Sequence, residues 1–91
     1  MNEITREQWA ARLRDPNSRQ AGGQLMSRDG AMCCLGHLAD LIDSDGWQGK
    51  FWHDLGSNLS GKGPAWINID QQLHATALND IFGWSLPQIA D

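Results

Sequence analysis

The shortness of the chain is the feature that most limits its fold. A chain of 91 residues buries only about two-thirds of the surface that it exposes when unfolded, so it can build one hydrophobic core and not two. Hydrophobic residues make up 41% of the sequence and charged residues 20%, which is typical of a globular protein and not of a disordered one. We therefore expect residues 1–91 to form a single domain.

Three agreeing signals predict a helix over residues 6–14. Thr5 is a good N-cap, and Gln8 three residues later completes a capping box with it. Ile4, just before the cap, can pack on Trp9 within the helix as a hydrophobic staple. The Asp-Pro pair that follows ends the helix, because the residue before a proline avoids the α region.

The next part of the chain predicts a β-hairpin that runs directly into a helix. The Asp29-Gly30 pair lies between residues 24–28 and 31–34 and is a good signal for a two-residue hairpin turn, because both residues can adopt positive φ. Such a turn would place Met26 opposite Cys33. Hydrophobic residues at helical spacing then predict a helix as far as residue 42.

The second half of the chain gives weaker signals. Residues 46–64 contain five glycines, so we interpret them as a folded loop. Residues 64–69 could supply one more short strand, after which Asp70 can cap a helix. The expected apolar face of that helix consists of Leu73, Ala77, Leu78, Ile81 and Phe82. Gly83 would end it, and Ser85 with Gln88 forms a capping box for a last helix.

The expected fold is therefore α+β. It has an N-terminal helix, a β-hairpin running into a second helix, a third short strand as an option, and two C-terminal helices. No stretch approaches the roughly 20 apolar residues of a membrane span, and the N-terminus lacks the features of a signal peptide. We expect no membrane contact and a cytoplasmic location.

Charge is distributed unevenly along the chain. Residues 1–28 hold five Arg against two Glu and one Asp, whereas residues 29–91 hold two Lys against eight Asp. This acidic balance disfavours direct binding to DNA or RNA, because phosphate contacts need clustered Lys and Arg. Residues 63–91 contain neither Lys nor Arg, which counts against the last two helices as a helix-turn-helix. The acidic balance favours a basic partner, or simply serves solubility.

An acidic cluster lies at the end of the second predicted helix. It consists of Asp40, Asp43, Asp45 and, further on, Asp54. One interpretation is a solvated surface, since charge clusters on helix faces are commonly just exposed. The alternative is a docking patch for an Arg- or Lys-rich partner surface, such as the nucleic-acid channel of a host effector. Exposed indoles would strengthen that alternative, and Trp47 and Trp52 are the candidates.

Cys33 and Cys34 are the only cysteines, and adjacent cysteines rarely reach disulfide geometry. We expect two free thiols, which is typical of a reducing compartment. With His37 they are weak candidates for a metal site, because structural zinc takes four ligands in paired short spacings. Cys34 precedes a predicted helix and could be a thiol nucleophile, but nothing assigns its base. Buried packing is the simpler interpretation, so we predict no metal and no cofactor.

Two segments resemble small bacteriophage and prophage proteins. The first is Arg19-Gln20, then Leu25-x-x-Arg28-Asp29-Gly30, then Cys33-Cys34-Leu35-Gly36-x-Leu38-x-Asp40-Leu41. The second is Leu78-Asn79-Asp80-x-x-Gly83-Trp84-Ser85-x-x-x-Ile89-Ala90-Asp91. Together they span less than half of the chain. The resemblance implies a phage context and the outline of the fold. His37 departs from it, because an aliphatic residue is commoner there.

Three functions are consistent with these observations. The preferred one is a phage accessory protein, most plausibly an anti-CRISPR protein, that inhibits a host defence complex, protein or ribonucleoprotein, by stoichiometric binding. The second is a phage structural or assembly module that forms a homodimer or binds another phage protein. The third is a small thiol- or metal-dependent enzyme. Because no reactive groups are spaced as an active centre requires, we predict a binding protein and not an enzyme.

Overall fold

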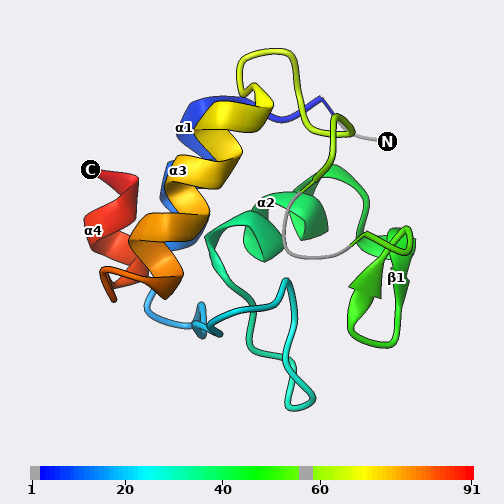
Figure 1. The fold of residues 1–91 in the computed structure, drawn as a ribbon, viewed down its shortest axis with the longest axis horizontal. Coiled ribbons are helices and arrows are strands. Elements are labelled where there is room, and N and C mark those ends of the chain that lie inside the picture. The colour runs from blue at the N-terminus through cyan, green and yellow to red at the C-terminus, as the bar shows by residue number, and fades with distance from the viewer. Residues whose placement is uncertain (1–2, 56–58) are drawn as a thin grey trace.

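Figure 1 shows a computed structural model of the protein, which describes residues 3–55 and 59–91. Within these ranges the fold is α+β, with four α-helices, a short 3-10 helix and a two-stranded antiparallel sheet. The elements are α1 (Arg6–Arg14), α2 (Cys34–Ile42), η1 (Ser44–Gly46), β1 (Trp47–Gln48), β2 (Phe51–Trp52), α3 (Ile69–Asp80) and α4 (Leu86–Ala90). None of the described helices is long and apolar enough to cross a membrane.

Helix α2 lies at the centre of the molecule (Figure 1). Seven of its nine residues are buried, as expected for a helix that is hydrophobic on all sides. A Cβ added to Gly36 would lie 2.0 Å from the carbonyl oxygen of Leu25, so only glycine allows the preceding loop to pack this closely. Cys33 caps the helix, because its Sγ accepts a hydrogen bond from the Gly36 backbone N–H at 3.4 Å.

The first and last helices pack against each other. Both capping boxes are confirmed, since α1 begins with Thr5 and Gln8 bonded reciprocally and α4 begins with Ser85 and Gln88. Arg14 at the end of α1 forms an ion pair of 2.6 Å with Asp91. This pair ties the C-terminus to the end of α1, whereas the two chain ends lie on opposite sides of the view in Figure 1.

The hairpin that we predicted around Asp29-Gly30 is wrong. A turn is present, but Ser27 N–H bonds to the Ala31 carbonyl at 2.7 Å, and Met26 pairs with Met32 and not with Cys33. The flanking residues form only isolated bridges, because Met32 also bonds to the backbone at Arg19. Its backbone groups are shared between two neighbouring segments, so no continuous two-stranded ladder forms.

The observed hairpin lies instead within the expected loop at 46–64. Trp47 pairs with Trp52 and Gln48 with Phe51. Gly49 in the two-residue connection has a φ of 63°, which favours glycine. Residues 56–58 of the expected loop lie outside the described residues.

The expected strand at 64–69 is also wrong, because residues 64–67 form turns and α3 already begins at Ile69. The N-cap is Asn68 and not Asp70: Asn68 and Gln71 form a third reciprocal capping box. Gly83, with a φ of 68°, follows α3, as the sequence predicted.

Candidate functional site

Asp40, expected in an acidic docking patch, is held inside the structure. Its Oδ2 lies 2.8 Å from the guanidinium of Arg12 on α1, and its Oδ1 accepts a hydrogen bond from the Trp47 indole at 3.0 Å. The side chain is only about one-quarter exposed. Asp40 therefore joins α1, α2 and β1.

Asp43 also pairs with groups of the protein itself. Its Oδ1 accepts from the Asp45 backbone N–H and caps η1, and its Oδ2 lies 2.9 Å from Nε2 of His53. The two other residues of the expected patch, Asp45 and Asp54, are exposed. The four carboxylates thus do not present one free acidic surface, although the role of the exposed pair in binding stays a prediction.

Trp52 is fully buried, so the expectation that it is an exposed indole is wrong. Its Nε1 donates a hydrogen bond to the Asp43 carbonyl at 2.9 Å, and its ring belongs to the hydrophobic core. Trp47 is half-buried. The exposed aromatic side chain of the hairpin is Phe51, half of whose surface is accessible.

The two cysteines are free and buried. Burial raises the pKa of Cys33 to about 11 and raises the pKa of Cys34 as well. Since the thiolate is the nucleophile and the metal ligand, this environment counts against both roles. Within residues 3–55 and 59–91, no group of three or more His, Cys, Asp or Glu is placed to hold a metal ion.

His37 is buried in α2. Its Nε2 lies 2.9 Å from the carbonyl oxygen of Arg19, so Nε2 carries the hydrogen, because a carbonyl only accepts. Its Nδ1 is buried and has no hydrogen-bond partner. Burial lowers the pKa of His37 below its usual 6.5, since a proton on Nδ1 would find no acceptor there.

Three of the five residues of the expected apolar face of α3 are exposed, contrary to our expectation, while Ala77 and Leu78 are half-buried. Leu73 is 50% exposed, and Ile81 and Phe82, just beyond the helix, are 77% and 66% exposed. Ile69, Leu73, Ala77 and Ile81 follow each other at intervals of four residues and so form one stripe. We call this stripe, of which Ala77 is the half-buried member, the outer face of α3.

The buried side of α3 consists of Gln72, Ala75 and Asn79. Asn79 Oδ1 accepts from the Cys34 backbone N–H at 3.3 Å, and its Nδ2 donates to the Ala21 carbonyl at 2.8 Å. Gln72 Oε1 accepts from the Leu59 N–H at 2.8 Å. The amides dock α3 by satisfying backbone groups of other segments, which leaves the outer face without a partner in the described structure.

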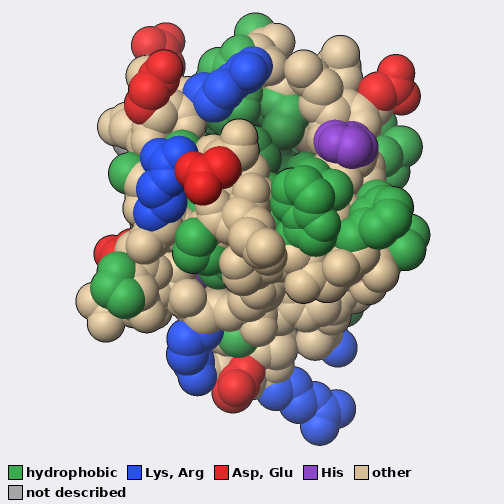
Figure 2. Space-filling view, turned by 90° about the vertical axis from the view of Figure 1, so that its left-hand side faces the viewer, with side chains coloured by type: hydrophobic (Ala, Val, Ile, Leu, Met, Phe, Trp, Pro, Cys, Tyr) green, Lys and Arg blue, Asp and Glu red, His purple; other side chains and the backbone are tan. Residues whose placement is uncertain are grey.

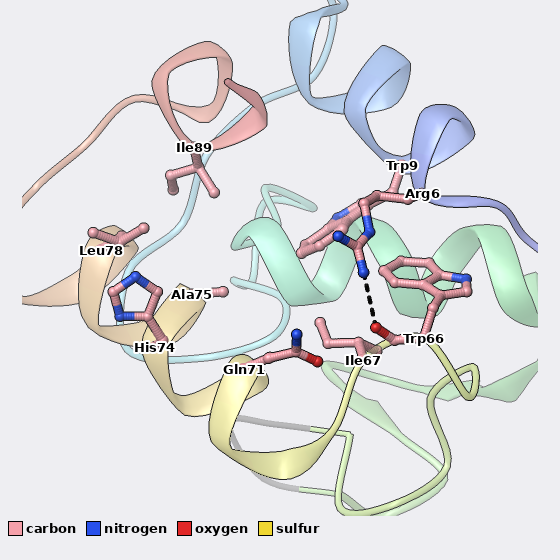
Figure 3. Close-up of a pocket in the computed structure, with 9 residues that line it drawn as sticks. All are labelled: Arg6, Trp9, Trp66, Ile67, Gln71, His74, Ala75, Leu78 and Ile89. Carbon is pink, nitrogen blue, oxygen red and sulfur yellow. Dashed lines mark hydrogen bonds between the residues drawn. The ribbon is translucent and has the colours of Figure 1, made fainter.

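A cavity of about 180 Å³ lies between α1, α3 and α4 (Figure 3). It is lined by Arg6, Trp9, Trp66, Ile67, Gln71, His74, Ala75, Leu78 and Ile89. Arg6 donates a hydrogen bond to the Trp66 carbonyl at 3.0 Å and lies 5.3 Å from the centre of the Trp66 ring. None of the described lining residues is Asp or Glu.

A second hollow continues from this cavity, because the two share His74, Leu78 and Ile89. It is lined further by Phe82, Trp84 and Asp91. Figure 2 shows hydrophobic side chains gathered beside a histidine on the side of the molecule that carries α4. The cavity with the second hollow is one candidate site, and the outer face of α3 is the other.

Little in the sequence points to these residues. Gln72, Ala75 and Asn79 have the spacing of a buried helix face, but two of them are polar, so the hydrophobic pattern outweighed them. Comparison with known proteins adds no family: no family model, no curated protein and no solved structure matches the chain.

Proposed function

We propose that the chain is a protein-binding module whose partner packs on the outer face of α3. The observation that carries this proposal is the inverted burial of α3, which exposes Leu73 and Ile81 while it buries the amides of Gln72 and Asn79. Contiguous exposed hydrophobic side chains with polar neighbours are typical of interaction sites. The chain would act by occupying a surface of its partner, without chemistry of its own.

Charge supports a basic partner. Asp70 and Asp80 flank the outer face at its two ends, and residues 63–91 contain no Lys or Arg. Two copies of α3 packed antiparallel would bring these carboxylates towards each other, which disfavours a homodimer through this face. A partner helix with Leu, Ile or Phe anchors and Lys or Arg flanks fits better. Its affinity should fall as ionic strength rises.

A host defence complex, with CRISPR effectors foremost, is the partner that we propose. The resemblance of residues 19–42 and 78–91 to small phage proteins supports this choice, as does the basic surface that a nucleic-acid channel offers. Binding through α3 replaces our first hypothesis of an acidic patch, because Asp40 and Asp43 are bonded internally.

The test is a capture assay with purified effector complex, combined with phage plating on defended hosts. The double variant Leu73→Ser, Ile81→Ser should lose at least about tenfold in affinity and should lose inhibition. The matched control is Phe51→Ser, which removes an equally exposed hydrophobic side chain from the hairpin. It should bind as the wild type does.

Three results would overturn the proposal. One is full capture by the α3 double variant. Another is that the double variant Asp45→Lys, Asp54→Lys loses capture while the α3 double variant keeps it. That result would assign partner binding to the acidic cluster. If the wild type is a dimer by light scattering and the α3 double variant a monomer, the assembly alternative is correct instead.

A further inference from the structure

The cavity between α1, α3 and α4 differs in charge from the rest of the protein. The chain has a net charge of −4, yet the titratable side chains among the described lining residues are those of Arg6 and His74. The remaining lining is apolar except for the amide of Gln71. A cavity of this composition favours an apolar molecule that carries a negative charge.

Arg6 is fixed at the cavity with donors to spare. One Nη group donates to the Trp66 carbonyl at 3.0 Å, and the guanidinium lies over the Trp66 ring. A guanidinium has five N–H donors, and Arg6 has no other hydrogen bond or ion pair within the described residues. Figure 3 shows the guanidinium directed towards the interior of the cavity. It is therefore placed to pair with a carboxylate.

The two indoles of the cavity offer rings and no free N–H. Trp9 donates its indole N–H to the Cys34 carbonyl at 2.8 Å, and Trp66 donates its own to the Ile4 carbonyl at 2.8 Å. Their ring centres are 5.8 Å apart. Because these bonds hold both rings in place, the cavity wall is preformed, and binding requires little ordering of side chains.

The volume suits a ligand of about one ring. A cavity of about 150 Å³ lined by apolar side chains accommodates benzene, and the present cavity measures about 180 Å³. We propose that this cavity binds a free aromatic monocarboxylate of about one ring, with its carboxylate on Arg6 and its ring against Trp9, Ile67 and Leu78. This site is independent of the protein-binding function proposed for the outer face of α3.

The experiment titrates benzoate and phenylacetate into the full chain and follows the indole N–H signals by NMR. The five Trp give five reporters, of which Trp9 and Trp66 line the cavity. We expect these two signals to shift with a Kd of about 1 mM or tighter, while those of Trp47 and Trp52 stay in place. Benzyl alcohol and acetate, which lack the charge and the ring respectively, should each bind at least about tenfold more weakly.

Arg6→Gln should weaken benzoate binding at least about tenfold and leave benzyl alcohol binding unchanged. The matched control is Arg28→Gln, which removes an exposed arginine from the turn at Asp29-Gly30 and should change neither. Leu73→Ser, Ile81→Ser should also leave benzoate binding intact, so failure of one proposal is distinguishable from failure of the other.

Three results would overturn the inference, and all three are measured on the wild-type chain. One is the absence of saturable shifts at the Trp9 and Trp66 signals. A second is equal affinity for benzoate and benzyl alcohol. A third is tighter binding of an acetylated tetrapeptide that ends in phenylalanine, which would assign the cavity to the carboxyl terminus of a protein.

If Arg6→Gln does not fold, Arg6→Lys keeps the charge but not the paired donors and should bind benzoate less tightly than the wild type.

Discussion

Helices α2 and α3 both pack against the hydrophobic core, but they do so through different kinds of side chain. Helix α2 is buried through hydrophobic side chains, with Leu35 and Leu38 fully inaccessible. Helix α3 is buried through Gln72 and Asn79 and keeps Leu73 exposed. The hydrophobic pattern of a helix therefore predicts its buried side only where no side-chain amide competes for that side with a better set of hydrogen bonds.

The difference has a physical reason. The N–H of Cys34 and the carbonyl of Ala21 are backbone groups that pair with Asn79 where water has little access. Leaving such groups without a partner costs about 1–3 kcal/mol each, which is comparable to the gain from burying one leucine side chain. The amide on α3 satisfies both groups at once. A hydrophobic residue in its place would leave them unpaired.

The largest expected effect is the difference in stability between a Leu→Ala substitution in α2 and one in α3. Leu38→Ala on α2 should lower the free energy of unfolding by about 3 kcal/mol, because it leaves a cavity in the core. Leu73→Ala on α3 should change it by less than about 0.5 kcal/mol. Urea denaturation of both variants measures the difference. Equal losses would show that the outer face of α3 is buried in solution.

The next effect tests how α3 is docked. Asn79→Ala should cost about 2–3 kcal/mol, since it unpairs the Cys34 N–H and the Ala21 carbonyl. Asn17→Ala, which removes an exposed amide without a side-chain hydrogen bond among the described residues, should have little effect. Asn79→Leu, measured by the same denaturation assay, distinguishes hydrogen bonding from hydrophobic burial as the cause. We expect a loss of stability, whereas a gain would mean that hydrophobic burial alone docks α3.

The smallest effect concerns the pH dependence of stability and compares His37 in α2 with His74 in α3. Burial lowers the pKa of His37 in the folded state below its usual 6.5, so the unfolded chain binds the proton more readily. The contribution of His37 to stability is therefore complete above about pH 6.5 and is lost as pH falls towards the folded pKa. Each unit of lowering is worth about 1.4 kcal/mol.

Denaturation between neutral and mildly acidic pH measures this slope. His37→Phe should remove it, and His74→Gln, which takes away an exposed imidazole of α3, should keep it. An unchanged slope in His37→Phe would assign the pH dependence to other groups.

The sequence predicted those elements whose ends depend on local chemistry. The capping boxes at Thr5 and Ser85 set the starts of α1 and α4 within a few residues of chain, and Gly83 follows α3 where a left-handed residue is needed. The equivalent box at Asn68 was overlooked because Ile67 and Ile69 suggested a strand. Its spacing, with Gln71 three residues on, was the available signal.

What the sequence could not predict depends on distant partners. Met32 pairs with segments on both sides, so the turn at Asp29-Gly30 does not lead to a regular hairpin. The candidate site was missed for the same reason, because the outward orientation of Leu73 depends on Asn79 finding Cys34, 45 residues earlier in the chain. No local pattern contains that information.

The packing of α1 against α4 makes the cavity depend on both helices being formed. Trp9 of α1 forms one wall and Ile89 of α4 another, so fraying of either helix removes a wall. Helix α4 has only five residues and is marginal alone. A molecule bound in the cavity would hold α1 and α4 together, and slower amide hydrogen exchange in α4 would report its presence.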